Sequence, residues 1–320
     1  MSIFRNTVWF LKGMKEYTCA GFTSAAKNFN AADLEVDCSG KDYMITGANS
    51  GIGKQTALEI AKRGGTVHMI CRNPEYGADA KKEISELSEN ANIHLHILDM
   101  SKPKDISSFA KEFTRNTGKI DVLINNAGCM VNTRELTDEK LEKNFATNTL
   151  GTYMITQSLL ELLKQSQEPR VITVSSGGML VQKLDVEDLQ FEKMSPFDGT
   201  MAYAQNKRQQ VVMTEHWAHE HDKIHFSVMH PGWADTPAVR NSMPEFHAKM
   251  KDKLRSIEQG ADTVVWLAVA KAPLNSPSGL FWQDRVSVST HLPLAWTRSS
   301  KQDEEKLLKE LSNFTEIFSN

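Results

Sequence analysis

Short apolar runs alternate with segments of helical pattern along most of the chain from residue 41 onward. Each run has the length of a strand buried in a sheet. The runs lie at 43–45, 66–71, 93–98, 121–124, 171–174, 224–229 and 280–282. Strands that alternate with helices predict a mostly parallel sheet covered by helices on both faces. We therefore expect a single α/β domain with a doubly wound, Rossmann-type sheet over residues 40–285.

Residues 1–39 precede this alternation and predict an N-terminal amphipathic extension. Its apolar positions fall at helical spacing, with basic residues between them: Phe4, Val8, Leu11 and Met14, with Arg5, Lys12 and Lys15. A helix with one apolar stripe usually packs on its own domain, and we favour that interpretation. The alternative is a helix that lies on a membrane surface. No run here approaches the ~20 apolar residues that span a bilayer.

Residues 286–320 follow the alternation and predict a C-terminal tail. Apolar residues recur there at helical spacing: Leu307, Leu308, Leu311, Phe314 and Phe318. We expect an amphipathic helix that either caps the fold or contacts a partner. Residues 177–200 show no clear period, so we interpret them as an insertion near the functional site.

The composition excludes some classes of function. The 320 residues carry 37 basic and 40 acidic side chains, a net charge of −3, so no basic excess points to nucleic acid. Four scattered cysteines (Cys19, Cys38, Cys71 and Cys129) form no CxxC pair, which suggests a reducing compartment. The clustered histidines lack accompanying cysteines or paired carboxylates, so we expect no metal. With no secretory signal pattern, the expected location is intracellular, either cytoplasmic or peripheral on a membrane, and not secreted.

A glycine-rich turn follows the first predicted strand. Its sequence is Thr46-Gly47-Ala48-Asn49-Ser50-Gly51-Ile52-Gly53-Lys54. Glycines at three of these positions allow a tight turn and a close approach of the backbone to a pyrophosphate, and the next helix offers its free N–H groups. Because the turn joins a strand to a helix, it predicts a dinucleotide site formed by Gly47, Asn49, Ser50, Gly51, Ile52 and Gly53.

The spacing T-G-x-x-x-G-x-G resembles that of the short-chain dehydrogenase/reductase family. Further matches follow in order along the chain: Asn125-Asn126-Ala127-Gly128, Asn148, Ser176, Tyr203-x-x-x-Lys207 and Pro231-Gly232. Together they cover about residues 40–285. The stretches TGANSGIGK, NNAGCM and VSSGGMLVQKL are similar to a branch of the family near the retinol dehydrogenases.

The end of the second strand bears on the choice of cofactor. A preference for NAD usually requires an acidic residue there, but the sequence reads Cys71-Arg72-Asn73. Arg72 can instead meet a 2′-phosphate, with Lys54 as a second positive charge. We therefore favour NADP(H), with NAD(H) possible. The resemblance also implies that Asp99 and Asn125 contact the adenine side of the cofactor.

The candidate catalytic residues are Tyr203, Lys207, Ser176 and Asn148. Tyr203 and Lys207 stand four residues apart and so project from one helix face. A phenol with a pKa near 10 needs a nearby cation to act as a base, and Lys207 provides one. By resemblance, both also bind the cofactor, Ser176 holds the substrate oxygen, and Asn148 holds a water beside Lys207. Ser175 is the alternative substrate contact.

These residues predict an oxidoreductase that transfers hydride between NADP(H) and a carbonyl or alcohol. A lipophilic small molecule is the expected substrate, because apolar residues gather near the predicted site: Met179, Leu180, Val181, Trp233, Val239, Met243, Phe246 and Met250. Burial of these residues in the core is the alternative. Two other functions remain open: a catalytically silent dinucleotide-binding sensor or scaffold, and a membrane-surface protein that acts through its N-terminal helix. Oligomerisation is possible.

Overall fold

The computed structural model describes residues 3–319. Eight strands form a single sheet: β1 Asp42–Thr46, β2 Thr66–Cys71, β3 Ile93–Ile97, β4 Val122–Asn125, β5 Arg170–Val174, β6 His225–Met229, β7 Leu280–Gln283 and β8 Val286–Ser287. Their order is β3-β2-β1-β4-β5-β6-β7-β8, and every pair is parallel except β7 with β8. The predicted class is confirmed, and the seven predicted strands are all present.

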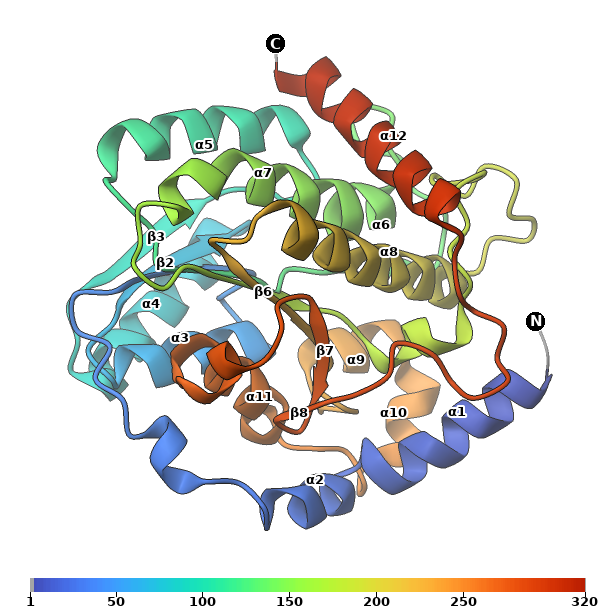
Figure 1. Ribbon diagram of the computed structural model, residues 1–320, viewed down its shortest axis with the longest axis horizontal. Helices are drawn as coiled ribbons and strands as arrows, with labels where there is room; N and C mark the ends of the chain where they lie inside the picture. Colours follow the sequence, from blue (N-terminus) through green and yellow to red (C-terminus); the bar gives the residue numbers. More distant parts are fainter. Residues whose placement is uncertain (1–2, 320) are drawn as a thin grey trace.

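Helices cover both faces of the sheet (Figure 1). One face packs against α3 Gly51–Ala61, α4 Pro74–Ser88 and α11 Ile257–Val269. The other packs against α5 Pro103–Asn116, α7 Thr152–Leu163 and α8 Gly199–Glu220. The strands alternate accordingly: Met44 belongs to the core on the second face, whereas its neighbours Tyr43 and Ile45 belong to the core on the first. A sheet buried on both faces explains why its strands appear as continuous apolar runs.

Shorter elements complete the fold, several of them at the carboxyl ends of the strands. They are η1 Ala31–Leu34, α6 Lys143–Phe145, the π-helical η2 Ala146–Gly151, η3 Gly177–Val181, α9 Pro237–Ser242, α10 Pro244–Met250 and η4 Ala272–Asn275. The C-terminal α12, Lys301–Ser319, lies across α5 and α8 and buries Leu307, Leu308 and Leu311 (Figure 1). It caps one end of the second core.

The N-terminal extension forms α1, Ile3–Glu16, and α2, Cys19–Ala26. The face of α1 that meets the domain is built on Val8, Trp9 and Gly13, whereas Phe4 and Leu11 of the predicted stripe are exposed. Gly13 lacks a side chain where Trp233 lies closest, so the helix can approach that indole ring. None of the helices within residues 3–319 is both long enough and apolar enough to cross a membrane.

Candidate active site

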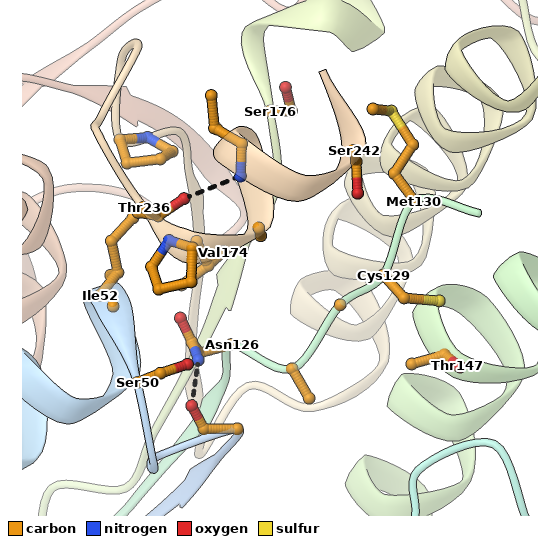
Figure 2. A pocket seen from close by; sticks show the side chains of 18 of the residues that line it. Ser50, Ile52, Asn126, Cys129, Met130, Thr147, Val174, Ser176, Thr236 and Ser242 are labelled. Atoms are coloured by element: carbon orange, nitrogen blue, oxygen red, sulfur yellow. Dashed lines mark hydrogen bonds between the residues drawn. The ribbon is translucent and has the colours of Figure 1, made fainter. Parts of the chain in front are cut away.

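A cavity of about 520 Å³ lies at the carboxyl ends of the strands. Its lining comes from residues that follow six strands: 47, 49–52, 72–73, 99–100, 126–130, 175–176 and 231–234. Figure 2 shows Asn126, Cys129 and Ser176 around this one space. In open α/β sheets this is the edge where ligands bind. The topology thus brings most of the predicted cofactor and catalytic residues to one cavity.

The glycine turn has the backbone geometry that its sequence predicts. Gly47 and Gly51 have φ values of 67° and 53°, in the left-handed region that other residues rarely occupy. A Cβ atom on Gly53 would lie only 2.3 Å from the carbonyl oxygen of Gly47. Side chains at these positions would distort the turn. In its native shape the turn leaves the N-terminus of α3 open to the cavity, where it can receive a phosphate.

A hydrogen-bond network that the sequence did not predict holds the turn to β4. Asn126 donates its amide to the carbonyl oxygens of Thr46 (2.8 Å) and Gly47 (3.2 Å; Figure 2). The Thr46 hydroxyl oxygen in turn accepts from the backbone N–H groups of Asn126 and Ala127. Asn125 is turned into the core, where it donates to Thr156 at 2.8 Å, and its side chain does not line the cavity. Its expected cofactor contact stays a prediction.

The adenine end of the cavity carries one exposed guanidinium group. Arg72 lines the cavity directly after β2, and no carboxylate stands beside it in residues 71–74. Lys54, proposed as a second positive charge, pairs instead with Glu83 at 2.5 Å and is absent from the cavity lining. Asp99 lines the cavity and accepts from the hydroxyl and backbone N–H of Ser101. Of the two cations expected to meet a 2′-phosphate, Arg72 lines the cavity and Lys54 does not.

Tyr203, Ser176 and Lys207 converge on the far side of the cavity. The Ser176 hydroxyl lies close enough to the Tyr203 phenol to lower its pKa. The Lys207 ammonium lies 5.3 Å from the centre of the Tyr203 ring and donates to the carbonyl oxygen of Val174 at 2.8 Å. Both Tyr203 and Lys207 come from one face of α8, as their spacing predicts. Phenol, hydroxyl and ammonium can thus act on one ligand.

Burial shifts the two titratable groups of this cluster in opposite directions. It raises the pKa of the Tyr203 phenol to about 12, with a further rise from Cys129, against the effect of the Ser176 hydroxyl. It lowers the pKa of the Lys207 ammonium to about 7, although Cys129 opposes this change. Desolvation disfavours the charged form of each group. At neutral pH the phenol therefore holds its proton, which is the form required to protonate a substrate oxygen.

Asn148 lies behind the cavity, on the π-helical turn η2, and is completely buried. Its side chain bonds to both the backbone N–H and the carbonyl oxygen of Cys129, each at 2.8 Å. The backbone carbonyl oxygen of Asn148 accepts from the Gln210 side chain at 2.7 Å, and the Gln210 side-chain oxygen accepts from Lys207 at 3.1 Å. Gln210 thus links Asn148 to Lys207, and the water that the resemblance implies beside Lys207 stays a prediction. No motif in the sequence marks Gln210.

The two neighbouring serines differ in what their hydroxyl groups contact. Ser175 is buried and donates to the carbonyl oxygen of Lys207 at 2.9 Å, so its proton is used in holding α8 to β5. Ser176 lies at the start of η3, partly exposed in the cavity and close to Tyr203, and its hydroxyl oxygen accepts from the Gly178 N–H at 3.2 Å. Of the two, Ser176 is free to reach a substrate oxygen next to the phenol.

Apolar residues line the cavity beyond Pro231. Trp233, Val239, Met243 and Phe246 border it, whereas Met179, Leu180 and Val181 are buried in a separate core cluster and Met250 is also buried. Thr236 begins α9 and accepts from the Val239 N–H at 3.3 Å (Figure 2). Part of the expected apolar set therefore borders the site, and part serves the core.

Histidines and acidic residues offer no metal centre in the part of the chain that the structure describes. Within residues 3–319, no three His, Cys, Asp or Glu side chains are grouped so that they could hold a metal ion. His68 and His96 contact each other at 3.1 Å across β2 and β3, away from the cavity. Burial lowers the pKa of His96 to about 4, so this imidazole is uncharged at neutral pH.

Comparison with known proteins identifies the family. A model described as short chain dehydrogenase matches residues 41–186. The chain is 59% identical to Dehydrogenase/reductase SDR family member 12 of Homo sapiens over 318 residues, 99% of this chain and all of that protein. It is 34% identical to Retinol dehydrogenase 12 of Mus musculus, across 78% of this chain and 79% of that protein. The chain therefore belongs to the short-chain dehydrogenase/reductase family, whose members are NAD(P)-dependent oxidoreductases.

Solved structures agree with this fold. An uncharacterized protein from Mycobacterium paratuberculosis superposes with a TM-score of 0.71 at 25% identity, over 90% of this chain and 97% of its own. A short chain dehydrogenase from Escherichia coli CFT073, complexed with NADPH, superposes with a TM-score of 0.62 at 22% identity, over 78% of this chain and 99% of its own. The doubly wound, Rossmann-type fold expected from the sequence is thereby confirmed.

Proposed function

We propose that this protein is an NADP(H)-dependent oxidoreductase that acts on a lipophilic carbonyl or alcohol. The observation that carries the proposal is the convergence of Tyr203, Ser176 and Lys207 in the same cavity as the glycine turn. A catalytically silent binder would need the turn but not a phenol and hydroxyl aimed at a common point beside it.

The cavity fits a nicotinamide dinucleotide, which supplies or accepts the hydride when bound. Gly47, Asn49, Ser50, Gly51 and Ile52 would hold its phosphates, because the close packing of Gly53 on Gly47 leaves their backbone open to the cavity. Asp99 would contact the adenine side. Tyr203 and Lys207 would hold the other end, and Asn148 with Gln210 would keep Lys207 in place.

Arg72→Ala is expected to weaken NADPH binding by about tenfold or more and to change NADH binding little. A charge-assisted contact to a phosphate contributes about 1.5–3 kcal/mol, and NADH lacks the 2′-phosphate that Arg72 would meet. Fluorescence titration of both cofactors measures the effect. Lys54→Ala is the matched control, because Lys54 is a cation of the same turn that pairs with Glu83 outside the cavity. Equal affinity of the parent protein for the two cofactors would overturn the preference.

The lipophilic character of the substrate rests on Trp233, Val239, Met243 and Phe246, which border the cavity next to Ser176. An apolar lining with a few polar groups selects ligands with large apolar surfaces. The relatives named as retinol dehydrogenases point in the same direction. We also propose that the oxidoreductase domain spans residues 40–285, between the N-terminal extension at 1–39 and the C-terminal tail at 286–320. Intracellular location and oligomeric state stay predictions.

A panel of aldehydes and ketones, with retinal and steroid types beside short soluble carbonyls, tests this function. The readout is loss of NADPH absorbance with the full-length protein. We expect at least one long-chain or cyclic apolar carbonyl to be reduced with a higher kcat/KM than the short carbonyls. Tight NADPH binding with no turnover of any carbonyl, and no oxidation of the matching alcohols, would favour the silent sensor instead.

A further inference from the structure

The N-terminal helix α1 is apolar on two opposite faces. One face packs on the domain through Val8, Trp9 and Gly13, and the Trp9 indole donates to the carbonyl oxygen of Gly177 at 2.7 Å. The other face points away from the protein and leaves Ile3 85% and Leu11 62% exposed. Phe4 belongs to that outer face and is 49% exposed. A surface helix normally turns polar residues outward, so this outer face lacks its expected covering.

A second segment, distant in the sequence, adds apolar side chains beside α1. Leu292 and Ala295 are buried in the same cluster as Val8 and Trp9, and the coil that carries them runs past α1 on its way to α12 (Figure 1). Between and after them, Leu294 and Trp296 are 75% and 82% exposed. Both have positive φ values, 56° and 55°, which are unfavourable for large side chains. The fold thus holds a leucine and a tryptophan outward at a cost in backbone energy.

The charges around this surface decide what can cover it. Helix α1 contains Arg5, Lys12 and Lys15 against one acidic residue, Glu16, which pairs with Lys12. Arg298 and Lys301 follow Trp296, ahead of the acidic residues 303–305. A second copy of the chain docked through the same face would bring these basic groups against each other. A bilayer with anionic lipids offers negative headgroups to the basic groups and an apolar layer to the leucine, phenylalanine and tryptophan side chains.

We propose that the outer face of α1 (Ile3, Phe4, Leu11) and the Leu294–Trp296 turn together form a docking surface for anionic membranes. Tryptophan suits such a boundary because its ring is apolar while its N–H can bond to headgroups or water. The contact is peripheral: the outer residues enter the interface, and the inner face of α1 stays on the domain.

The docking surface adjoins the mouth of the active-site cavity. Phe10, on the flank of α1, contacts Trp233 with ring centres 6.0 Å apart. Trp233 in turn meets Phe246 at 5.2 Å, and both rings line the cavity. A docked protein would therefore hold this apolar wall next to the bilayer, from which a lipophilic substrate can enter. This last step rests on the proposed function, whereas the docking does not.

Co-sedimentation of the full-length protein with vesicles tests the docking. The vesicles are phosphatidylcholine alone or phosphatidylcholine mixed with phosphatidylserine. We expect binding to the mixed vesicles that weakens as salt rises, and a loss of about tenfold or more in Leu11→Asp and in Trp296→Asp. Leu87→Asp is the matched control, because Leu87 is a leucine 57% exposed on α4, outside the docking surface. It should bind like the parent protein.

Four further measurements make the outcome decisive. Thermal melting and NADPH titration of each variant show whether the fold and the cofactor site persist; a docking variant that loses both is replaced by Leu294→Ser. Quenching of tryptophan fluorescence by brominated lipid should fall in Trp296→Phe. The proposal would be overturned if the parent protein did not bind the mixed vesicles, or if the docking variants bound them as well as Leu87→Asp does. The proposal would also be overturned if light scattering showed that the parent protein is a dimer and that Trp296→Asp is a monomer.

The membrane test is independent of catalysis. Reduction of a short, water-soluble carbonyl should be the same in the parent, Leu11→Asp and Trp296→Asp. If no variant and no parent reduces any carbonyl, the proposed function fails while the vesicle data still decide the docking. If the parent reduces carbonyls but ignores vesicles, only the docking fails.

Discussion

Replacing Tyr203 with phenylalanine should lower the rate of carbonyl reduction about 10²–10⁴-fold. In the proposed reaction the phenol is the proton donor: burial raises its pKa to about 12, so it is protonated at neutral pH, and the Ser176 hydroxyl lies close to it. Hydride delivered to the carbonyl carbon would leave negative charge on the substrate oxygen, and Tyr203 would give its proton to that oxygen. Phenylalanine keeps the ring but removes the proton.

Single-turnover oxidation of NADPH with an accepted carbonyl measures this loss, and fluorescence titration follows cofactor affinity separately. Tyr153→Phe is the matched control, because Tyr153 is a buried tyrosine of α7 that packs on Trp217 and does not line the cavity. Parental turnover in Tyr203→Phe would place the proton transfer elsewhere. Unchanged NADPH affinity in that variant shows that the loss belongs to the chemical step.

Ser176→Ala should lower the same rate about 10²–10³-fold, the usual effect of removing one donor to a developing oxyanion. Its hydroxyl opens into the cavity beside the phenol of Tyr203 and can hold the substrate oxygen while charge develops there. The adjacent Ser175→Ala should change the rate far less, because the Ser175 hydroxyl donates to the Lys207 carbonyl oxygen. We expect Ser175→Ala to cost about 1 kcal/mol of folding stability instead.

The Ser175→Ala and Ser176→Ala variants are compared by their single-turnover rates and, in parallel, by urea unfolding. Ser176→Ala should leave the unfolding midpoint almost unchanged, and Ser175→Ala should lower it. A larger rate loss in Ser175→Ala than in Ser176→Ala would reverse the two roles and make Ser175 the substrate contact.

The seven parallel strands could be predicted because burial on both faces makes each of them a continuous apolar run. The eighth could not: β8 consists of Val286 and Ser287 alone and pairs only with β7. Two residues carry no period. The sequence pattern also could not predict which face of α1 packs on the domain. That face is set by the contact between Gly13, which has no side chain, and the indole of Trp233, which follows β6. Helical spacing identifies a helix but not the surface that it meets.

The candidate site was predictable where a short motif carries the chemistry. Tyr203 and Lys207 lie four residues apart on one helix, so their convergence follows from local geometry. Gln210 was missed because its role depends on a contact with the backbone of Asn148, 62 residues earlier in the chain. The choice between Asn125 and Asn126 depends on strand orientation: one faces the core and the other faces the glycine turn. Adjacent identical residues give no signal for that choice.

The attachment of α1 has a consequence for how the chain folds during synthesis. Trp9 bonds to Gly177, and the carbonyl oxygen of Glu16 accepts from Arg255, 239 residues later, which Asp284 holds in place. Helix α1 is synthesised long before the last part of the sheet, so its inner face cannot be covered until that part is made. At about 5–20 residues per second this interval lasts on the order of ten seconds to a minute. During it α1 exposes two apolar faces, so the nascent chain offers a binding site to a chaperone well before the dehydrogenase domain is complete.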